Sequence, residues 1–456
     1  MQKIHLIAIG GSAMHNMAIA LKEKGYIVTG SDDEIFEPSR ARLASKGLLP
    51  AQMGWFPDEN IHSNLDAVIL GMHARADNPE LLKAQKLGLK IYSYPEYIYE
   101  QSKDKQRVVV AGSHGKTTIT SMILHVLKYN QKNFDYMVGA QIDGFETMVR
   151  LSDAPVIVIE GDEYLASPIT RTPKFLQYNH HITAISGIAW DHINVFPTFE
   201  EYKKQFELLV EATPKSGIIV YNEDDKHLNA IIKNVKREDV NKIAYTEHKS
   251  KIKEGNTYLS AGDDKVPIKF FGEHNMYNVM AAKEVCMKLG VSENGFYNAI
   301  QSFRGAANRL ELLAENGITK IFKDFAHAPS KLKATTKAVA GQFPKHKFIA
   351  VLELHTFSSL NKAFLNQYED TFDKPDVSVV YFNPETVKHK KLPEITIEEV
   401  KKGFNKSKLE VFTDSKKVVE FVKKQNLKDT VLLFMTSGNF DGLDLKALAN
   451  ELTNNS

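Results

Sequence analysis

A short polar loop between an apolar run and an amphipathic run is the clearest sign of chemistry in this chain. The stretch VVVAGSHGKTTITSMILHVL, residues 108–127, has valines before the loop and Lys-Thr-Thr after it. A loop that leaves a strand and opens a helix offers backbone N–H groups and the positive helix end to phosphate. Lys116 adds a point charge, and the Thr117 hydroxyl can bind Mg²⁺. These residues predict ATP binding; the alternative for a bare Gly-Lys-Thr is a glycine turn beside a surface lysine.

The loop departs from the common phosphate-binding pattern G-x-x-x-x-G-K-S/T. Counting back from Gly115 places Val110 where the first glycine belongs. What remains is a shorter loop, Gly112 to Thr117, between a predicted strand and a predicted helix. That setting favours phosphate binding over the plain turn, but it does not reveal the reaction.

Acidic and imidazole side chains follow two later apolar runs. VIVIEGDEY ends in carboxylates, beginning with Glu160, and AISGIAWDHINVF carries Asp191 and His192. Because α/β sheets gather ligand groups at the carboxyl ends of their strands, we expect Glu160 and His192 to converge beside the phosphates. They would hold Mg²⁺ there, directly or through water. Taken alone, each is also typical of a structural or solvated side chain.

Three blocks of alternating strand and helix patterns position these motifs. The predicted strands include KIHLIAIGG in the first block, PVIVIEGDEY in the second and KHKFIAVLEL in the third. Alternation of this kind predicts an α/β protein with parallel sheets. We expect three domains, over residues 1–103, 104–302 and 303–456, with the polar stretch 100–107 as the first linker. The structure of the charged segment 226–253 is left open.

Composition excludes several classes of protein. The 456 residues are 43% hydrophobic and 25% charged, with a formal net charge of +2, so no overall charge favours nucleic acid as a partner. Neither a signal-peptide layout nor an apolar run long enough to cross a membrane is present, which predicts a cytoplasmic enzyme without a membrane partner. The single cysteine, Cys286, rules out an internal disulfide and is expected in the core.

Six motifs in a fixed order give the chain a resemblance to a known family. GSHGKTT, EGDEY, DHINVF, GEHNMYN, NRLEL and KDFAHAP follow one another as in the Mur ligases, the ATP-dependent amide-forming enzymes of peptidoglycan precursor synthesis. The chain resembles that family over nearly its whole length. The resemblance implies a Rossmann-like N-terminal domain, a central phosphate-loop ATPase-like domain and a Rossmann-like C-terminal domain.

The resemblance also implies roles for individual residues. The predicted catalytic residues are Lys116, Glu160, His192 and Arg309, and the predicted metal ligands are Thr117, Glu160 and His192. ATP would be bound by Gly112, Ser113, His114, Gly115, Lys116, Thr117, Thr118, Asn275, Asn278, Arg309 and Asp324, the two asparagines serving adenine and Asp324 the ribose. The cofactors implied are ATP and Mg²⁺.

The first block resembles the family's UDP-sugar domain. IAIGGSAMHN and VTGSDDE imply that Gly10, Gly11, Ser12 and Asp32 bind UDP-N-acetylmuramate. Ala8 and Ala13 stand where relatives commonly have glycine, which puts close backbone approach there in doubt. A dinucleotide site is the alternative, but the chain lacks G-x-G-x-x-G at this turn.

Two departures bear on metal binding and on the acceptor. Phe206 stands where several relatives carry a carbamylated lysine, so no such lysine is predicted. In LELHTFSSLNK, Thr356 and Ser359 replace the two arginines of L-alanine-adding relatives. This favours the recycling branch, which attaches L-alanyl-γ-D-glutamyl-meso-diaminopimelate to UDP-N-acetylmuramate, with His327, His355 and Ser358 as substrate contacts.

Two alternatives to that function stay open at this point. One is the L-alanine-adding activity of de novo peptidoglycan synthesis. The other is a nucleotide-dependent switch that makes no bond; it would explain the phosphate loop but not a UDP-sugar turn. The oligomeric state is not predicted.

Overall fold

The computed structural model describes residues 1–190, 195–253, 255–305 and 309–454. The chain divides into two compact units, each considered by itself below. One contains residues 1–188, 199–246 and 281–296, and the other contains residues 189–198, 247–280 and 297–456. In the described part of the chain, no helix is long and apolar enough to span a membrane.

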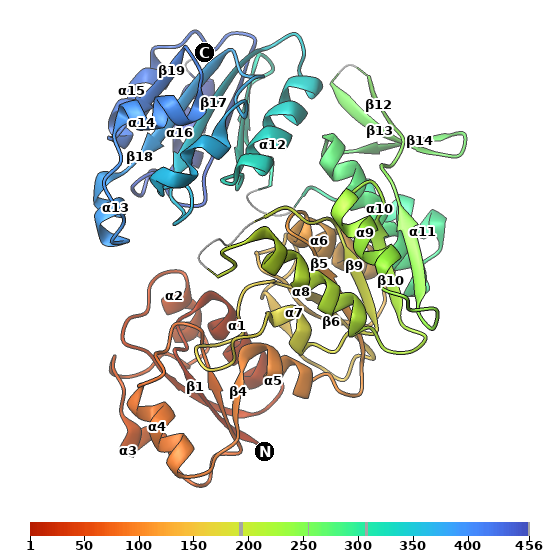
Figure 1. Ribbon diagram of the computed structural model, residues 1–456, viewed down its shortest axis with the longest axis vertical. Helices are drawn as coiled ribbons and strands as arrows, with labels where there is room; N and C mark the ends of the chain where they lie inside the picture. The colour runs from red at the N-terminus through yellow and green to blue at the C-terminus, as the bar shows by residue number, and fades with distance from the viewer. Residues whose placement is uncertain (191–194, 254, 306–308, 455–456) are drawn as a thin grey trace. The chain divides into compact units, whose positions relative to one another are not determined.

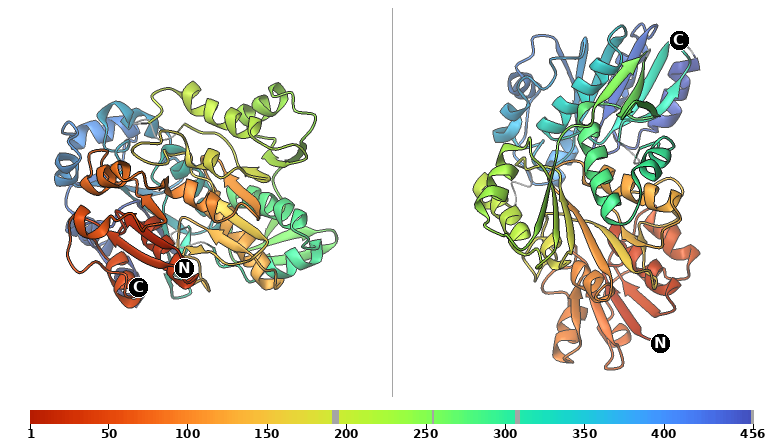
Figure 2. Two further views of the ribbon diagram at one scale, coloured as in Figure 1. Left: turned by 90° about the horizontal axis from the view of Figure 1, so that it is seen from below. Right: turned by 90° about the vertical axis from the view of Figure 1, so that its right-hand side faces the viewer.

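The first sheet is four-stranded and parallel, as the alternating pattern predicts. Its order is β2-β1-β3-β4, built from β1 (Lys3–Ile7), β2 (Ile27–Ser31), β3 (Ala67–Leu70) and β4 (Ile91–Ser93). The helices of this region are α1 (Ser12–Glu23), α2 (Ser39–Ser45), α3 (Pro57–Asn60), α4 (Pro79–Lys86) and α5 (Tyr94–Glu100). Figure 2 shows this region in red and orange from two sides.

The second sheet has seven strands in the order β11-β10-β9-β5-β8-β6-β7. They are β5 (Gln106–Ala111), β6 (Asp135–Met137), β7 (Val149–Arg150), β8 (Val156–Glu160), β9 (Ile182–Ile185), β10 (Ile218–Asn222) and β11 (Asn241–Tyr245). Only the β6–β7 pair is antiparallel. The helices here are α6 (Lys116–Tyr129), α7 (Lys174–Gln177), α8 (Phe199–Glu211) and α9 (Lys226–Asn234). Because β5 and β8 are parallel neighbours, the segments that follow them leave the same edge of the sheet.

A small antiparallel sheet follows in the sequence, drawn in green in Figure 1. It consists of β12 (Ser250–Lys253), β13 (Asn256–Ala261) and β14 (Asp264–Ile268). Its first strand falls at the end of the charged segment whose structure the sequence leaves open. Helices α10 (Glu273–Lys288) and α11 (Glu293–Ile300) come next, and Cys286 on α10 is fully buried, as predicted.

The last sheet is buried on both faces. Its order is β15-β16-β20-β17-β18-β19, with β15 (Glu311–Glu315), β16 (Thr319–Asp324), β17 (Lys347–Leu354), β18 (Val377–Phe382), β19 (Leu409–Phe412) and β20 (Thr430–Met435). Only β15 runs antiparallel to its neighbour. The helices are α12 (Pro329–Gln342), the 3₁₀ helix η1 (Lys362–Tyr368), α13 (Pro384–His389), α14 (Ile397–Phe404), α15 (Ser415–Lys423) and α16 (Leu445–Asn454). Alternate residues of β17 enter two separate cores, Ala350 one and Val351 the other, which explains the continuous apolar run at residues 348–352.

Candidate active site

The predicted phosphate loop leaves β5 and opens α6, which begins at Lys116. Gly112 and Gly115 have φ angles of +123° and +79°, in the region that favours glycine. A Cβ on Gly112 would lie 2.1 Å from Ser186 Oγ, so the loop also needs glycine for space. The predicted ATP residues Gly112, Ser113, His114, Gly115, Lys116, Thr117 and Thr118 all lie in this loop or in the first turn of the helix.

Lys116 is held by two acceptors at the mouth of the loop. Its Nζ donates to the Gly112 carbonyl at 2.8 Å and to Glu163 Oε2 at 2.6 Å. Burial acts to lower the pKa of the ammonium, but the nearby carboxylates of Glu163, Asp162 and Glu160 outweigh burial and raise it. Lys116 is therefore a fixed positive charge beside the helix terminus, not a mobile surface lysine.

Thr117 and Glu160 form an oxygen-rich pair next to this lysine. The Thr117 hydroxyl donates to Glu160 Oε1 at 2.8 Å, and the Gly139 N–H donates to Glu160 Oε2 at 2.7 Å. Hydroxyl and carboxylate oxygens are the ligands that Mg²⁺ prefers, so this pair fits the predicted metal site. His192, the third predicted ligand, lies outside the described residues.

Two residues that the sequence interpretation missed complete the network. Tyr202, on α8, donates its hydroxyl to Glu163 Oε1 at 3.0 Å and lies 2.8 Å from Ser113 Oγ. Glu163 and Tyr202 are both fully buried. The third carboxylate of EGDEY is the signal for Glu163, since a partly buried lysine is stabilised by a counter-ion. No local signal marks Tyr202, because it comes from a distant helix.

Phe206, at the position where several relatives carry a carbamylated lysine, is a core residue. It is fully buried and packs against Phe175 and Tyr202, with ring centroids 5.5 and 5.4 Å apart. The neighbouring Lys203 and Lys204 instead pair with glutamates of their own helix.

The predicted UDP-sugar turn is built around Asp32. The Gly10 N–H donates to Asp32 Oδ2 at 2.7 Å, and a Cβ on Gly10 would meet that carboxylate at 2.9 Å. Burial raises the pKa of Asp32 to about 6, while the Gly10 N–H acts to lower it. Gly11 is the N-cap of α1 and Ser12 its first residue, so these predicted residues cluster at one helix terminus. Ala8 has a φ of +65°, a conformation that costs an alanine about 1–2 kcal/mol.

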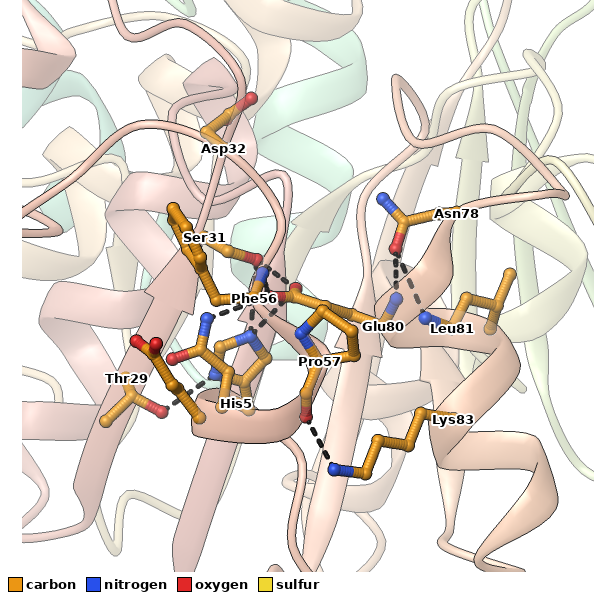
Figure 3. Close-up of polar contacts among 12 residues, drawn as sticks. His5, Thr29, Ser31, Asp32, Phe56, Pro57, Asn78, Glu80, Leu81 and Lys83 are labelled. Carbon is orange, nitrogen blue, oxygen red and sulfur yellow. Dashed lines mark hydrogen bonds and ion pairs between the residues drawn. The ribbon is translucent and has the colours of Figure 1, made fainter.

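A buried carboxylate that the sequence interpretation missed supports this turn from below (Figure 3). Glu80, on α4, is fully buried and accepts hydrogen bonds at Oε1 from the Phe56 N–H at 2.9 Å and from Asn60 Nδ2 at 2.7 Å. At Oε2 it accepts from the Ser31 hydroxyl and lies 3.3 Å from His5 Nε2. Burial acts to raise the pKa of Glu80, but these hydrogen bonds outweigh burial and lower it. Glu80 thus fixes the end of β2, immediately before Asp32.

The predicted adenine residues lie one turn apart on α10. Asn278 Nδ2 donates to Asn275 Oδ1 at 3.1 Å, and Asn275 Nδ2 donates to the Phe271 carbonyl at 2.8 Å. Both asparagines are buried. They belong to the second compact unit, whereas the phosphate loop belongs to the first.

Arg309, Asp324 and His327 lie around the end of β16. Asp324 accepts the Leu310 and Ala326 N–H groups, each at 2.7 Å, so its carboxylate orders the chain next to Arg309. The Arg309 guanidinium lies 4.7 Å from the ring centroid of Phe325. His327 Nδ1 lies 2.8 Å from the Phe325 carbonyl. The structure brings these three predicted residues together, and their assignment to nucleotide or substrate stays a prediction.

His355 faces a cleft of about 640 Å³ at the carboxyl ends of β17 and β18, the edge where α/β sheets place ligands. The other lining residues are Glu385, Thr386, Lys388, His389 and Lys390, on α13 and just beyond it. Ser358 and His327, the other two predicted substrate contacts, do not line this cleft. Thr356 and Ser359 bond each other, Oγ1 to Oγ at 2.9 Å, and close the turn between them.

A phosphate loop at the carboxyl edge of a mostly parallel sheet, with a partly buried, ion-paired lysine and a hydroxyl–carboxylate pair beside it, defines a nucleotide-using α/β enzyme. Family descriptions match most of the chain: "Mur ligase family, catalytic domain" over residues 3–106, "Mur ligase middle domain" over 110–286 and "Mur ligase, glutamate ligase domain" over 308–438. A UDP-N-acetylmuramate–L-alanine ligase of Sulfurihydrogenibium sp. (strain YO3AOP1) is 31% identical over 387 residues, which are 83% of this chain and 82% of the relative. The chain belongs to the Mur ligase family and is an ATP-dependent amide ligase.

Solved structures share the fold. The UDP-N-acetylmuramate-alanine ligase of Thermotoga maritima superimposes with a TM-score of 0.73 at 20% identity, over 100% of this chain and 99% of that one. The UDP-N-acetylmuramate:L-alanyl-gamma-D-glutamyl-meso-diaminopimelate ligase of Neisseria meningitides has a TM-score of 0.60 at 26% identity, over 66% of this chain and 98% of that one. The predicted family and α/β fold class are thus confirmed. The predicted boundaries at residues 103 and 302 stay a prediction.

Proposed function

We propose that this enzyme joins the carboxylate of UDP-N-acetylmuramate to the amine of L-alanine, with conversion of ATP to ADP and phosphate. The observation that carries this proposal is the activity named for the Sulfurihydrogenibium relative, which aligns with 83% of the chain. The comparisons therefore favour the alternative acceptor over the tripeptide that the sequence motifs favoured.

The proposed reaction has two steps. A carboxylate oxygen of UDP-N-acetylmuramate attacks the γ-phosphorus of ATP and displaces ADP, giving an acyl phosphate. The neutral amine of the acceptor then attacks the acyl carbon, the C–O bond to phosphate breaks, and the nitrogen loses a proton. Lys116 and the N–H groups that open α6 stabilise the negative charge on the transferring phosphoryl oxygens.

The remaining residues are assigned to binding. Thr117, Glu160 and His192 are proposed to hold Mg²⁺, which when bound neutralises phosphate charge. Gly10, Gly11, Ser12 and Asp32 are proposed to bind the UDP-sugar at the first sheet. Asn275, Asn278, Arg309 and Asp324 are proposed to bind ATP, as the resemblance implies.

A second acceptor, L-alanyl-γ-D-glutamyl-meso-diaminopimelate, is supported by the last domain. The sequence contains no arginine after Arg309, so a bidentate arginine clamp for the carboxylate of free L-alanine is missing there. The cleft beside His355 carries Lys388, His389 and Lys390 together with Glu385, so both charge signs could meet a peptide that has carboxylates and an amine.

A direct comparison of the two acceptors tests the proposal. Purified protein is given UDP-N-acetylmuramate, ATP and Mg²⁺ with either acceptor at equal concentration, and phosphate release and product mass are measured. Higher kcat/KM with L-alanine supports the first proposal, whereas higher kcat/KM with the tripeptide supports the second. Phosphate release that needs neither UDP-N-acetylmuramate nor an amine contradicts both.

A further inference from the structure

A chain of hydrogen bonds begins and ends in the phosphate loop. Ser113 Oγ lies 2.8 Å from the Tyr202 hydroxyl, which donates to Glu163 Oε1 at 3.0 Å. The other oxygen of Glu163 accepts from Lys116 Nζ at 2.6 Å. Because Ser113 and Lys116 both belong to the phosphate loop, these hydrogen bonds form a closed ring. The ring connects the loop with α8 and with the segment after β8.

Packing fixes the middle of this ring. Tyr202 and Glu163 are each 0% exposed. The Tyr202 ring packs edge-on against Phe206, and Phe206 packs against Phe175. The tyrosine hydroxyl therefore cannot leave Glu163 without disturbing a close-packed core.

The ring leaves Lys116 with one direction for a ligand. An ammonium group has three N–H donors, and the Gly112 carbonyl and Glu163 take two of them. The positions of these two acceptors fix the direction of the third N–H. We propose that Tyr202 and Glu163 are positioning residues that orient Lys116 toward the transferring phosphoryl group; this rests on the proposed role of Lys116 in ligation.

The negative charge around Glu163 explains why both of its oxygens need hydrogen-bond donors. Three carboxylates lie at the end of β8 or just after it, those of Glu160, Asp162 and Glu163. Lys174 pairs with Asp162 at 2.6 Å, and Glu160 accepts from Thr117 and Gly139. A Glu163 carboxylate that lost its tyrosine donor would present more negative charge to the phosphates and would pull Lys116 away from them.

The first test removes one oxygen atom. Tyr202→Phe keeps the buried ring and deletes the hydroxyl that bonds Glu163. Tyr178→Phe is the matched control, because Tyr178 is also fully buried in the same compact unit and its hydroxyl has no hydrogen-bond partner among the described residues. We expect Tyr202→Phe to lower kcat about 10- to 100-fold with a smaller change in the KM for ATP, as misorientation affects the transition state most. The control is expected to match the wild type.

The second test removes the charge of Glu163. Glu163→Gln keeps one oxygen as an acceptor but not the charged acceptor that holds Lys116 Nζ, so we expect kcat to fall about 10-fold or more with a smaller change in the KM for ATP. A merely structural role for Glu163 would lower thermal stability without separating kcat from KM in this way. Glu163→Gln also keeps the inference testable if Tyr202→Phe does not fold, which thermal unfolding of each variant checks.

The positioning role of Tyr202 and Glu163 and the proposed role of Lys116 can be refuted separately. If Tyr202→Phe has the kcat of Tyr178→Phe, or if Glu163→Gln has the kcat of the wild type, the positioning inference is overturned. Lys116→Ala is measured alongside. If that variant keeps normal turnover, the role of Lys116 itself falls; if it is inactive while Tyr202→Phe is normal, only the positioning inference falls.

Discussion

The buried carboxylate of Glu80 offers a prediction in which two substitutions at one position should differ strongly. Glu80→Ala removes both carboxylate oxygens that accept hydrogen bonds in the network below Asp32. Glu80→Gln keeps one oxygen for the Phe56 N–H and the Asn60 amide, and its own amide can donate to the Ser31 hydroxyl oxygen. Glu80→Ala should therefore leave hydrogen-bond donors without an acceptor, whereas Glu80→Gln still supplies one.

The magnitude follows from the groups left without partners. In Glu80→Ala the Phe56 N–H and Asn60 Nδ2 lose their acceptor, at about 1–3 kcal/mol each. Ser31 and His5 can still bond each other, since Oγ and Nε2 are 3.3 Å apart. Removing the buried charge returns part of this cost, so we expect a net loss of about 3–5 kcal/mol for Glu80→Ala. Glu80→Gln should cost about 1 kcal/mol.

Trp55 provides a reporter in the same region. It packs, partly buried, against the core of the first sheet, and the only other tryptophan is Trp190. In a Trp190→Phe background, urea unfolding followed by tryptophan fluorescence reports this region alone, which matters because a chain of several domains need not unfold in one step. The KM for UDP-N-acetylmuramate should rise more than the KM for ATP in Glu80→Ala, because Asp32 follows Ser31 directly.

Equal unfolding free energies for Glu80→Ala and Glu80→Gln would refute this reasoning. The pH dependence supplies an independent check. The pKa of Glu80 is lowered in the fold, so its stabilisation is present above the unfolded value and is lost as pH falls through the folded value. The difference in stability between wild type and Glu80→Gln should therefore shrink in acid; a constant difference would contradict the network.

Three further predictions concern the two ligand sites. Lys116→Ala should lower kcat about 100- to 1,000-fold in the phosphate-release assay, with circular dichroism as the check that the variant is folded. The pKa of Asp32 is raised to about 6, so its charged form destabilises the fold increasingly as pH rises from about 4 through 6. Asp32→Asn, which keeps an acceptor for the Gly10 N–H, should therefore raise the urea midpoint at pH 7.5 more than at pH 5. Gly112→Ala should abolish ATP binding by calorimetry, because its Cβ would collide with Ser186 Oγ.

Elements with a strong apolar pattern could be predicted from the sequence. The residues 108–111 and 156–159 read as buried strands, and they are the adjacent strands β5 and β8. The hairpin strands β12 to β14 could not be predicted in this way. Residues 251–253 are exposed, so no apolar run marks that part of the chain as a strand.

The same distinction separates the site residues that could be predicted from those that were missed. Lys116 and Thr117 are recognisable because their motif is contiguous, and Glu160 because it ends a strand. Glu163, Tyr202 and Glu80 act through partners that only tertiary packing brings near them. Their burial and pairing, not their sequence neighbours, give them their roles.

The choice of acceptor can be separated from the chemistry of the phosphate loop. L-alanine and the tripeptide both present the amine of an L-alanyl residue, so the proposed acyl transfer is the same for either. They differ in where their carboxylates lie and in whether a second amine is present. A residue that distinguishes the two acceptors must therefore contact the part of the acceptor away from the reacting amine.

The cleft at His355 has cationic and anionic groups suited to that part, while Thr356 and Ser359 are already bonded to each other. Substitutions in this cleft should thus change the ratio of kcat/KM values for the two acceptors, while Lys116→Ala should lower both together.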